Sequence, residues 1–291
     1  MDPLVRPEPL TGLGAVDALP GVHGAVLGYP SHPPGETGLG RFRLAHRALP
    51  GRDLADVVLR TRFLGAELAA PVLVGAGQAR TATEHGLGLV GNDHAPERPP
   101  LWLASYDVTR LRGPDDAEQA ERLVAALEAD GLVVRLDGMS QALREDGQPL
   151  MRYATEAIAS VAERLAPLPV VVRGGGFGLD AADVRELREA GVAAIDVGGA
   201  AVAGWGIPVA DSLAEAVLAT PGVPLLAEVD DGVDAAKCLA LGATAVTVAS
   251  ADVEPFLHTL RAAVWSTGAH SAAALTPGHL RQPDPWRPPL A

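Results

Sequence analysis

Eight short apolar runs, most of them followed by a helical pattern, constrain the fold of this 291-residue chain more than any other feature. The runs are rich in Val, Leu and Ile with little alternation, which is typical of parallel strands buried on both faces. They occupy residues 71–74, 86–91, 101–105, 132–137, 169–173, 193–197, 223–229 and 244–249. Helical patterns cover roughly 114–130, 151–165, 180–190, 208–220, 232–241 and 252–266. Strands alternating with crossover helices predict an α/β fold, a closed (β/α)8 TIM barrel.

An open doubly wound sheet is the alternative fold. It is usually marked by a Gly-rich first turn, which Gly75-Ala76-Gly77-Gln78 matches only in part. The stretch between the first two runs is too short for a full crossover helix, which counts against the barrel. Both ends of the chain are rich in Pro and Gly, so we expect an irregular arm over 1–40, a single barrel over 41–272 and a Pro-rich tail over 273–291.

Composition excludes several kinds of partner. The net charge of -13 repels polyphosphates, so nucleic acids and anionic membranes are poor partners. A single cysteine, Cys238, excludes a disulfide within the chain and a thiolate zinc cluster. The histidines show no metal-ligand spacing, and we expect no metal. Apolar runs of about 18 residues and a signal-peptide pattern are both absent, so we expect a cytoplasmic protein without a membrane span.

Charged residues stand where the predicted strands end, which is where barrel enzymes place their active sites. Three are carboxylates, Asp137, Asp196 and Glu228, and two are arginines, Arg135 and Arg173. Charges inside apolar strands are costly unless they are paired or functional. They either neutralise one another at the barrel mouth, or the arginines hold an anionic substrate group while a carboxylate moves a proton.

Three aromatic residues and one acidic turn also lie near strand ends. Tyr106, Phe177 and Trp205 either line a pocket or pack at the rim. The seventh run leads into Asp230-Asp231-Gly232, followed by Asp234, where barrels usually bind phosphate. Three carboxylates would repel a phosphate, and Asp231 or Asp234 can equally serve as a helix N-cap.

Several motifs in a fixed order carry a family resemblance. They are His46-Arg47-Ala48-Leu49-Pro50, Phe63-Leu64-Gly65, the segments 135–142, 169–178 and 191–199, Trp205-Gly206-Ile207, Asp234-Ala235-Ala236-Lys237 and Ala240-Leu241-Gly242-Ala243. Over roughly residues 41–266 this set resembles type 2 isopentenyl diphosphate isomerase, a flavin-dependent barrel isomerase. The resemblance implies a TIM barrel, an isoprenoid substrate, FMN and Mg²⁺ as cofactors, and a homo-oligomer.

The chain departs from the family at functional positions. Ser140 stands where the family has the glutamine thought to move the substrate proton, and Gln141 replaces the magnesium-binding glutamate. A neutral amide is a poor ligand for a hard cation. The substrate-side His and Asn of the family become Arg135 and Asp137, and its flavin-contacting lysine becomes Arg173.

The flavin loops differ as well. Gly77-Gln78-Ala79-Arg80 replaces the family's Met-Thr-Gly-Gly loop, Ser105 replaces an Asn, and Glu228-Val229-Asp230 replaces the Ser-Gly-Gly phosphate cradle. These correlated losses indicate that flavin binding is gone, so no cofactor is favoured. If flavin does bind, the expected contacts are Gln78, Ser105 and Arg173.

The sequence therefore predicts an isomerase or cyclase of isoprenoid metabolism that works by acid/base proton transfer without flavin. The expected catalytic residues are Asp137, Asp196 and Glu228, and the expected substrate contacts are Arg135, Ser140, Gln141, Arg173, Tyr106 and Trp205. Two alternatives stay open. One is a working FMN-dependent isopentenyl diphosphate delta-isomerase, and the other is a non-catalytic partner subunit of a biosynthetic enzyme.

Overall fold

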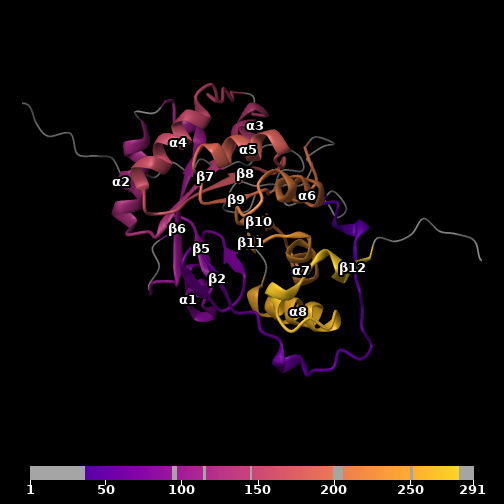
Figure 1. Ribbon diagram of the computed structural model, residues 1–291. Helices are drawn as coiled ribbons and strands as arrows, with labels where there is room; N and C mark the ends of the chain where they lie inside the picture. Colours follow the sequence, from indigo (N-terminus) through magenta and orange to yellow (C-terminus); the bar gives the residue numbers. More distant parts are fainter. Residues whose placement is uncertain are drawn as a thin grey trace, which may run out of the picture.

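The computed structural model contains the predicted closed barrel (Figure 1). It describes residues 37–93, 97–113, 116–144, 146–198, 206–249 and 252–281. The eight barrel strands pair in parallel and close in the order β10-β11-β4-β5-β6-β7-β8-β9, which excludes the open doubly wound sheet. They are β4 (Val72–Val74), β5 (Gly88–Val90), β6 (Leu101–Asp107), β7 (Gly131–Leu136), β8 (Val170–Gly174), β9 (Ala194–Asp196), β10 (Leu225–Glu228) and β11 (Ala245–Val248).

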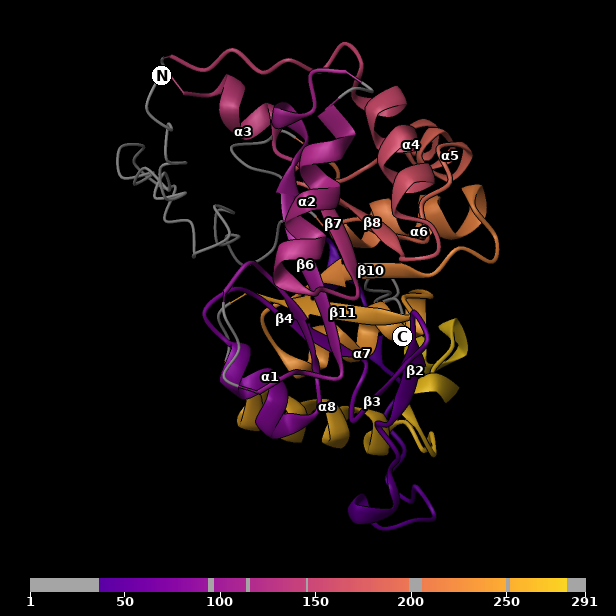
Figure 2. The ribbon, with the colours of Figure 1, turned by 90° about the vertical axis from the view of Figure 1, so that its left-hand side faces the viewer.

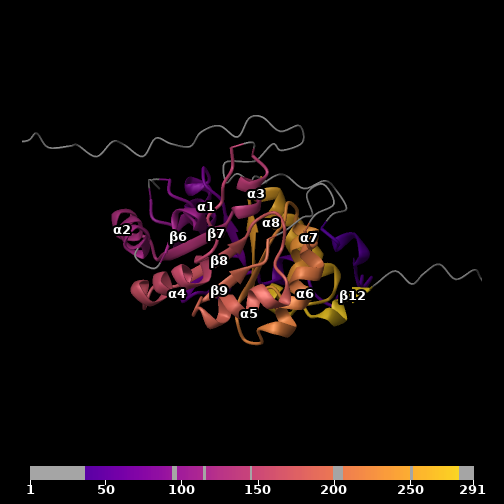
Figure 3. The same cartoon turned by 90° about the horizontal axis from the view of Figure 1, so that it is seen from above.

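Helices surround the strands, as the view from above shows (Figure 3). They are α1 (Ala79–His85), α2 (Ala117–Leu127), α3 (Gly138–Ala142), α4 (Ala154–Leu165), α5 (Ala181–Glu189), α6 (Val209–Ala219), α7 (Gly232–Leu241) and α8 (Val253–Ser266). The short connection between β4 and β5 holds α1, a helix of only 7 residues, so two turns are enough to bridge the first two strands. None of the described helices is long and apolar enough to cross a membrane.

Short elements outside the barrel tie its ends together. The 3-10 helices are η1 (Leu39–Arg41), η2 (Leu54–Asp56), η3 (Val108–Arg110), η5 (Ala272–Ala274) and η6 (Pro277–His279). Strand β1 (Arg43–Leu44) pairs antiparallel with β12 (Leu280–Arg281), which joins the segment before the barrel to the segment after it. Residues 1–36 and 282–291, which make up most of the expected arm and part of the expected tail, lie outside the described residues.

A hairpin closes the end of the barrel at which the strands begin. It consists of β2 (Thr61–Phe63) and β3 (Ala66–Leu68), joined by Leu64 and Gly65, both at positive φ. The buried side chains of Phe63 and Leu68 pack in one cluster with the residues that fill the barrel interior. Figures 1 and 2 place this hairpin below the strands and α3 above them, so the mouth at the α3 end is the place for a site.

The barrel interior changes from apolar to charged toward its mouth. Successive side chains of a strand point to opposite faces, so residues two apart share a face. Val171, Ala194, Leu226 and Ala245 belong to the apolar interior cluster. Two positions further along these four strands come the polar residues Arg173, Asp196, Glu228 and Thr247. The strand register therefore gathers these four polar side chains into one layer at the mouth.

Helix α7 lies unusually close to α8 because its first residue is Gly232. A Cβ atom at this position would lie 2.3 Å from the backbone nitrogen of Leu260 and 2.6 Å from the carbonyl oxygen of Phe256. Such contacts are with backbone atoms, which cannot rotate away. The two helices can hold this separation only with glycine here.

We expect Gly232→Ala to lower the free energy of unfolding by about 1–3 kcal/mol, because overpacking forces α7 away from α8. Gly40→Ala is the matched control, since its Cβ would meet no atom within 4 Å. It should change the free energy of unfolding by less than about 0.5 kcal/mol. Urea unfolding of both variants measures the difference, and equal stabilities would contradict the close approach of the helices.

Candidate functional site

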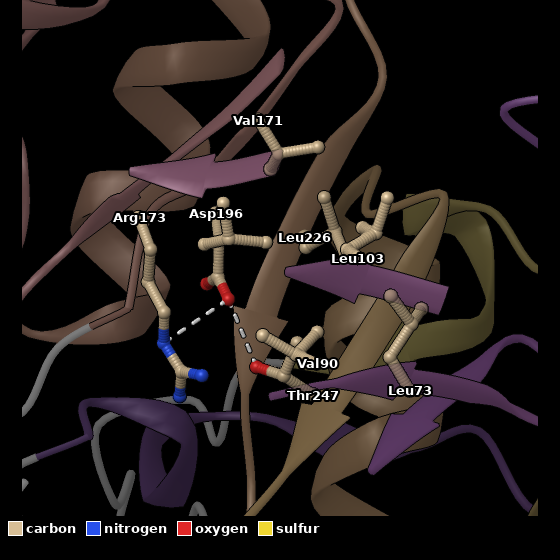
Figure 4. Close-up of a pocket in the computed structure, with 9 residues that line it drawn as sticks. Leu73, Val90, Leu103, Val171, Arg173, Asp196, Leu226 and Thr247 are labelled. Atoms are coloured by element: carbon tan, nitrogen blue, oxygen red, sulfur yellow. Dashed lines mark hydrogen bonds and ion pairs between the residues drawn. The ribbon is translucent and has the colours of Figure 1, made fainter. Parts of the chain in front are cut away.

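An ion triad of Arg173, Asp196 and Glu228 lies at the mouth of the barrel. The Arg173 Nε lies 3.4 Å from Oδ2 of Asp196, and its Nη2 lies 2.5 Å from Oε2 of Glu228. The Asp196 carboxylate also accepts a hydrogen bond from the Gly198 backbone N–H at 2.9 Å. It accepts another from the Thr247 hydroxyl at 3.0 Å (Figure 4). The three charged side chains are almost completely buried, with exposed fractions of 2%, 2% and 7%. Arg173 therefore pairs with two carboxylates inside the protein, which leaves one negative charge in excess when both are ionised.

Burial affects the protonation of one member of the triad, Asp196. The pKa of Asp196 is raised above its usual value, mainly because burial disfavours the ionised form. The neighbouring Arg173 acts in the opposite direction, whereas Glu228 raises the pKa further. Asp196 therefore holds its proton to a higher pH than an exposed aspartate does.

A second cluster surrounds Arg135 at the end of β7. Its Nη2 lies 3.3 Å from Oδ2 of Asp137 and 3.7 Å from Oδ2 of Asp107. Gln141 on α3 donates from Nε2 to Oδ2 of Asp107 at 3.2 Å and to the Thr109 hydroxyl at 2.7 Å. The charged members are only partly buried, with side-chain exposures between 14% and 20%. This cluster is the part of the charged mouth that a substrate can reach.

The strand register places the two clusters side by side. Across β6, β7, β8 and β9 the paired residues are Asp107, Arg135, Arg173 and Asp196. Two arginines on adjacent strands repel each other, and like charges directly opposite destabilise a sheet. The flanking carboxylates compensate for this repulsion. Together with Asp137 and Glu228, the mouth holds four carboxylates around two arginines, so it carries excess negative charge when all are ionised.

Little space remains below this charged layer. The cavity inside the barrel measures about 10 Å³, which is at the lower limit for one water molecule. It is lined by Leu73, Val90, Leu103, Val133, Val171, Arg173, Asp196, Leu226 and Thr247. The described interior of the barrel at this level therefore has no room for a substrate.

The acidic turn after β10 caps its own helix. Asp231 accepts hydrogen bonds from the backbone N–H groups of Val233 and Asp234 at 2.7 and 3.0 Å through Oδ1. Asp234 in turn forms an ion pair with Lys237 at 2.8 Å. Free N–H groups at a helix N-terminus are a common site for phosphate. Here a carboxylate of the same chain already occupies that position on α7.

Two buried polar atoms lack a hydrogen-bond partner where the expected flavin contacts lie. Gln78 donates from Nε2 to the carbonyl of Ala249 at 3.0 Å, whereas its Oε1 is buried without a partner. The Ser105 hydroxyl is likewise buried and unpartnered. The backbone of Ser105 pairs with the Asn92 amide through two hydrogen bonds of 2.8 Å. Such atoms are unusual in a folded protein, and a bound ligand is one way to satisfy them.

The remaining residues that the sequence predicts for the site lie in different places in the structure. Gln141 joins the Arg135 cluster, and Ser140 lies beside it on α3. Tyr106 points away from this cluster, since its neighbours Ser105 and Asp107 face the interior. Its hydroxyl donates to Oε1 of Gln119 on α2 at 3.3 Å, so Tyr106 packs between the barrel and the helices. Trp205 lies outside the described residues.

Asp107 is the main site residue that the sequence prediction missed. The apolar run ends at Ser105, but β6 continues to Asp107, which pairs in register with Arg135. The sequence does contain a signal for it. Alternate residues of a strand point to the same face, so Leu103, Ser105 and Asp107 all point to the barrel interior. No group of three or more His, Cys, Asp or Glu side chains suited to a metal ion occurs in the described parts of the chain.

Comparisons with solved structures agree with this architecture. A mandelate oxidase structure covers 84% of this chain and 87% of its own, with a TM-score of 0.63 and 22% identity. A mandelate oxidase variant with a monooxide FMN adduct covers 86% of this chain and 93% of its own, also with a TM-score of 0.63 and 22% identity. At this identity the likeness concerns the fold alone. The protein therefore has the (β/α)8 fold that mandelate oxidase also adopts.

Sequence comparison assigns the family. No protein-family model matches the chain. Isopentenyl-diphosphate delta-isomerase of Stutzerimonas stutzeri is 31% identical over 84% of this chain and 91% of its own length. The enzymes of the same name from Xanthobacter autotrophicus and Deinococcus radiodurans are 34% and 32% identical, over 82% and 78% of this chain and 90% and 82% of their own lengths. The chain belongs to the type 2 isopentenyl diphosphate isomerase family, whose members are isomerases of isoprenoid metabolism.

The raised pKa of Asp196 predicts a specific dependence of stability on pH. The folded state binds this proton more tightly than the unfolded state, in which the aspartate has its ordinary pKa of 3.8. The contribution of Asp196 to stability is therefore fully present below this value and is lost as the pH rises through the folded pKa.

We expect Asp196→Asn to remove this loss, so the stability of the variant relative to the wild type should improve as the pH rises from about 4. Urea unfolding at a series of pH values measures the two curves. If the substitution itself changes the free energy of unfolding by a constant amount, the difference in slope between the two curves stays the same. Parallel curves would contradict the assignment.

Proposed function

We propose that this protein is an isomerase or cyclase of isoprenoid substrates that transfers a proton with its own carboxylates and without FMN. One observation carries the proposal. Four carboxylates surround two arginines at the mouth, so the arginines stay compensated even when Asp137 carries the proton that it donates. Such a mouth is suited to a reaction in which positive charge develops on carbon, because fixed charges stabilise it in a partly desolvated site.

Asp137 is the proton donor in this proposal. Its side chain is 14% exposed, compared with 2% for Asp196 and 7% for Glu228, so it is the most accessible of the three predicted carboxylates. Protonated Asp137 gives its proton to one carbon of a double bond, which leaves a carbocation on the other carbon. Loss of a proton from the adjacent carbon to a carboxylate shifts the double bond. Attack by a second double bond before that loss closes a ring. Neither route changes the oxidation state of the substrate.

Asp196 and Glu228 act as positioning residues. Both carboxylates face Arg173 below the level that a substrate can reach. Because they fix the Arg173 guanidinium, they determine how much positive charge faces Arg135 on the neighbouring strand. Arg135 in turn holds Asp137 at 3.3 Å. The triad thus supports the donor through the strand register.

The described residues do not fit the phosphate of FMN. The Asp231 carboxylate accepts from the N–H groups of Val233 and Asp234 in the first turn of α7, which a phosphate could otherwise use. Arg173, at the position of the flavin-contacting lysine of the family, is 2% exposed and paired with two carboxylates. A dianionic phosphate at this end of the barrel would face Asp231 and Asp234 at short range. These features favour a reaction that runs without FMN.

An FMN-dependent isopentenyl diphosphate delta-isomerase is the second candidate. The relatives carry this isomerase name, and the unpartnered Gln78 Oε1 and Ser105 Oγ favour a polar ligand at the mouth. Both atoms can bond the edge of a flavin ring, since one accepts and the other accepts or donates. They can equally bond another polar group, so they do not outweigh the misfit at the phosphate end.

The absorption spectrum of the purified full-length protein, with and without added FMN, separates the two candidates. We expect a colourless protein whose addition leaves the visible spectrum of free FMN unchanged, because no anion site is available at α7. Riboflavin serves as the control ligand, since it has the same ring without the phosphate. A yellow protein that retains FMN in equimolar amount after gel filtration would support the second candidate.

Asp137→Asn tests the proton donor. In D₂O without FMN, we expect the wild type to incorporate deuterium into isopentenyl diphosphate or a longer prenyl substrate. The variant should lose about 10²–10⁴-fold in rate, the usual contribution of a general acid. Asp146→Asn is the matched control, because Asp146 lies on the same connection but is 86% exposed. Equal rates for the wild type and Asp137→Asn would remove the assignment.

A further inference from the structure

An apolar rim occupies the connection between β7 and α4. We use this name for Met139, Leu143, Leu150, Met151 and Tyr153, whose exposed fractions range from 37% to 55%. Of the ten exposed large hydrophobic residues in the described parts of the chain, these five fall within 15 positions. Single exposed apolar residues need no explanation, but clusters of them mark ligand or partner sites.

The apolar rim is directly continuous with the Arg135 cluster. Asp137 is the N-cap of α3, and Met139 follows it in the first turn of this helix. The Met151 side chain lies against Gly138, where an added Cβ would come within 2.9 Å of its sulfur. Gln141 holds α3 over the end of β6 through Asp107 and Thr109. Figure 2 shows α3 above β6 and β7, so the rim lies on the mouth side of the barrel.

The apolar surface extends beyond the immediate surroundings of Asp137. Met139 and Met151 are the members next to the start of α3. Leu143 is the C-cap of α3, and Tyr153 is the N-cap of α4, with Leu150 shortly before it. An α-helix rises about 1.5 Å per residue, so Leu143 at the C-cap lies about 9 Å along α3 from Asp137 at its N-cap. A five-carbon isopentenyl skeleton reacting at Asp137 is shorter than this, whereas a longer hydrocarbon chain can reach along the rim.

We infer that the substrate is an isoprenoid longer than one five-carbon unit, whose hydrocarbon chain lies along the apolar rim while its reacting double bond sits at Asp137. This inference rests on the proposed function, because it takes Asp137 as the reacting group. The charges of the mouth agree with it. The compensated arginines offer little attraction to a headgroup, so hydrophobic contact has to supply most of the binding free energy.

Binding of a chain-length series tests the inference separately from catalysis. The probes are prenyl alcohols and prenyl diphosphates of five, ten and fifteen carbons, titrated by calorimetry into the full-length Asp137→Asn protein. Because this variant is read by binding alone, a failure of Asp137 as proton donor does not affect the result. We expect the affinity to rise about tenfold with each added five-carbon unit, because burying part of each unit contributes hydrophobic binding free energy.

Substitutions in the rim make the test specific. In the Asp137→Asn background, Leu143→Ser with Leu150→Ser should reduce the tenfold steps to about twofold or less. Leu218→Ser is the matched control, because Leu218 is an exposed leucine on α6, outside the rim, and should leave the steps unchanged. Comparing the alcohols with the diphosphates shows whether the headgroup contributes, and a dominant headgroup effect would overturn the inference.

Two further results would also overturn it. One is equal affinity across the chain lengths, which would show that the rim does not contact the substrate. The other is a change of oligomeric state in the double variant, measured by sedimentation, with the chain-length dependence unchanged. That result would assign the rim to contact between two copies of the chain.

Discussion

The ion triad of Arg173, Asp196 and Glu228 is the interaction on which the rest of the mouth depends. A buried arginine is tolerated only with carboxylate partners, because an unpaired charge in the interior is very costly. The strands supply these partners through their register alone, since each charged residue follows an apolar interior residue by two positions. The triad thus closes the interior from above, as the β2–β3 hairpin closes it from below. What remains available for chemistry is the surface between these charges and α3.

This arrangement places buried charges and solvent-accessible charges side by side at the mouth of the barrel. Arg173 and its partners are buried, whereas Arg135, Asp107 and Asp137 stay in contact with solvent. The two arginines occupy neighbouring strands, so a change in one cluster alters the electrostatic potential at the other. In a (β/α)8 barrel the residues at the strand ends can differ between proteins that share the fold, because function depends on sites placed on the fold.

The sequence predicted the barrel well because its signals are local. All eight strand runs and the six long helical patterns correspond to elements of the structure, with boundaries that differ by a few residues. The β2–β3 hairpin and α3 were not predicted, since three-residue strands and a five-residue helix are too short for a periodic pattern.

The strand ends also indicated most of the charged residues of the candidate site. Pairing could not be read from the chain, because it depends on register between strands far apart in sequence. Asp107 was left out of the predicted site although the alternation along β6 points it inward, and Tyr106 was expected near a pocket although it faces α2.

The pairing of β1 with β12 has a consequence for the connectivity of the chain. Arg43 and Leu44 lie beside Arg281 and Leu280, so the described polypeptide enters and leaves the barrel at one place. A short linker between these two segments would turn the chain into a ring without disturbing a strand. New ends could then be opened in a surface connection, and the same eightfold architecture would arise from a circularly permuted gene.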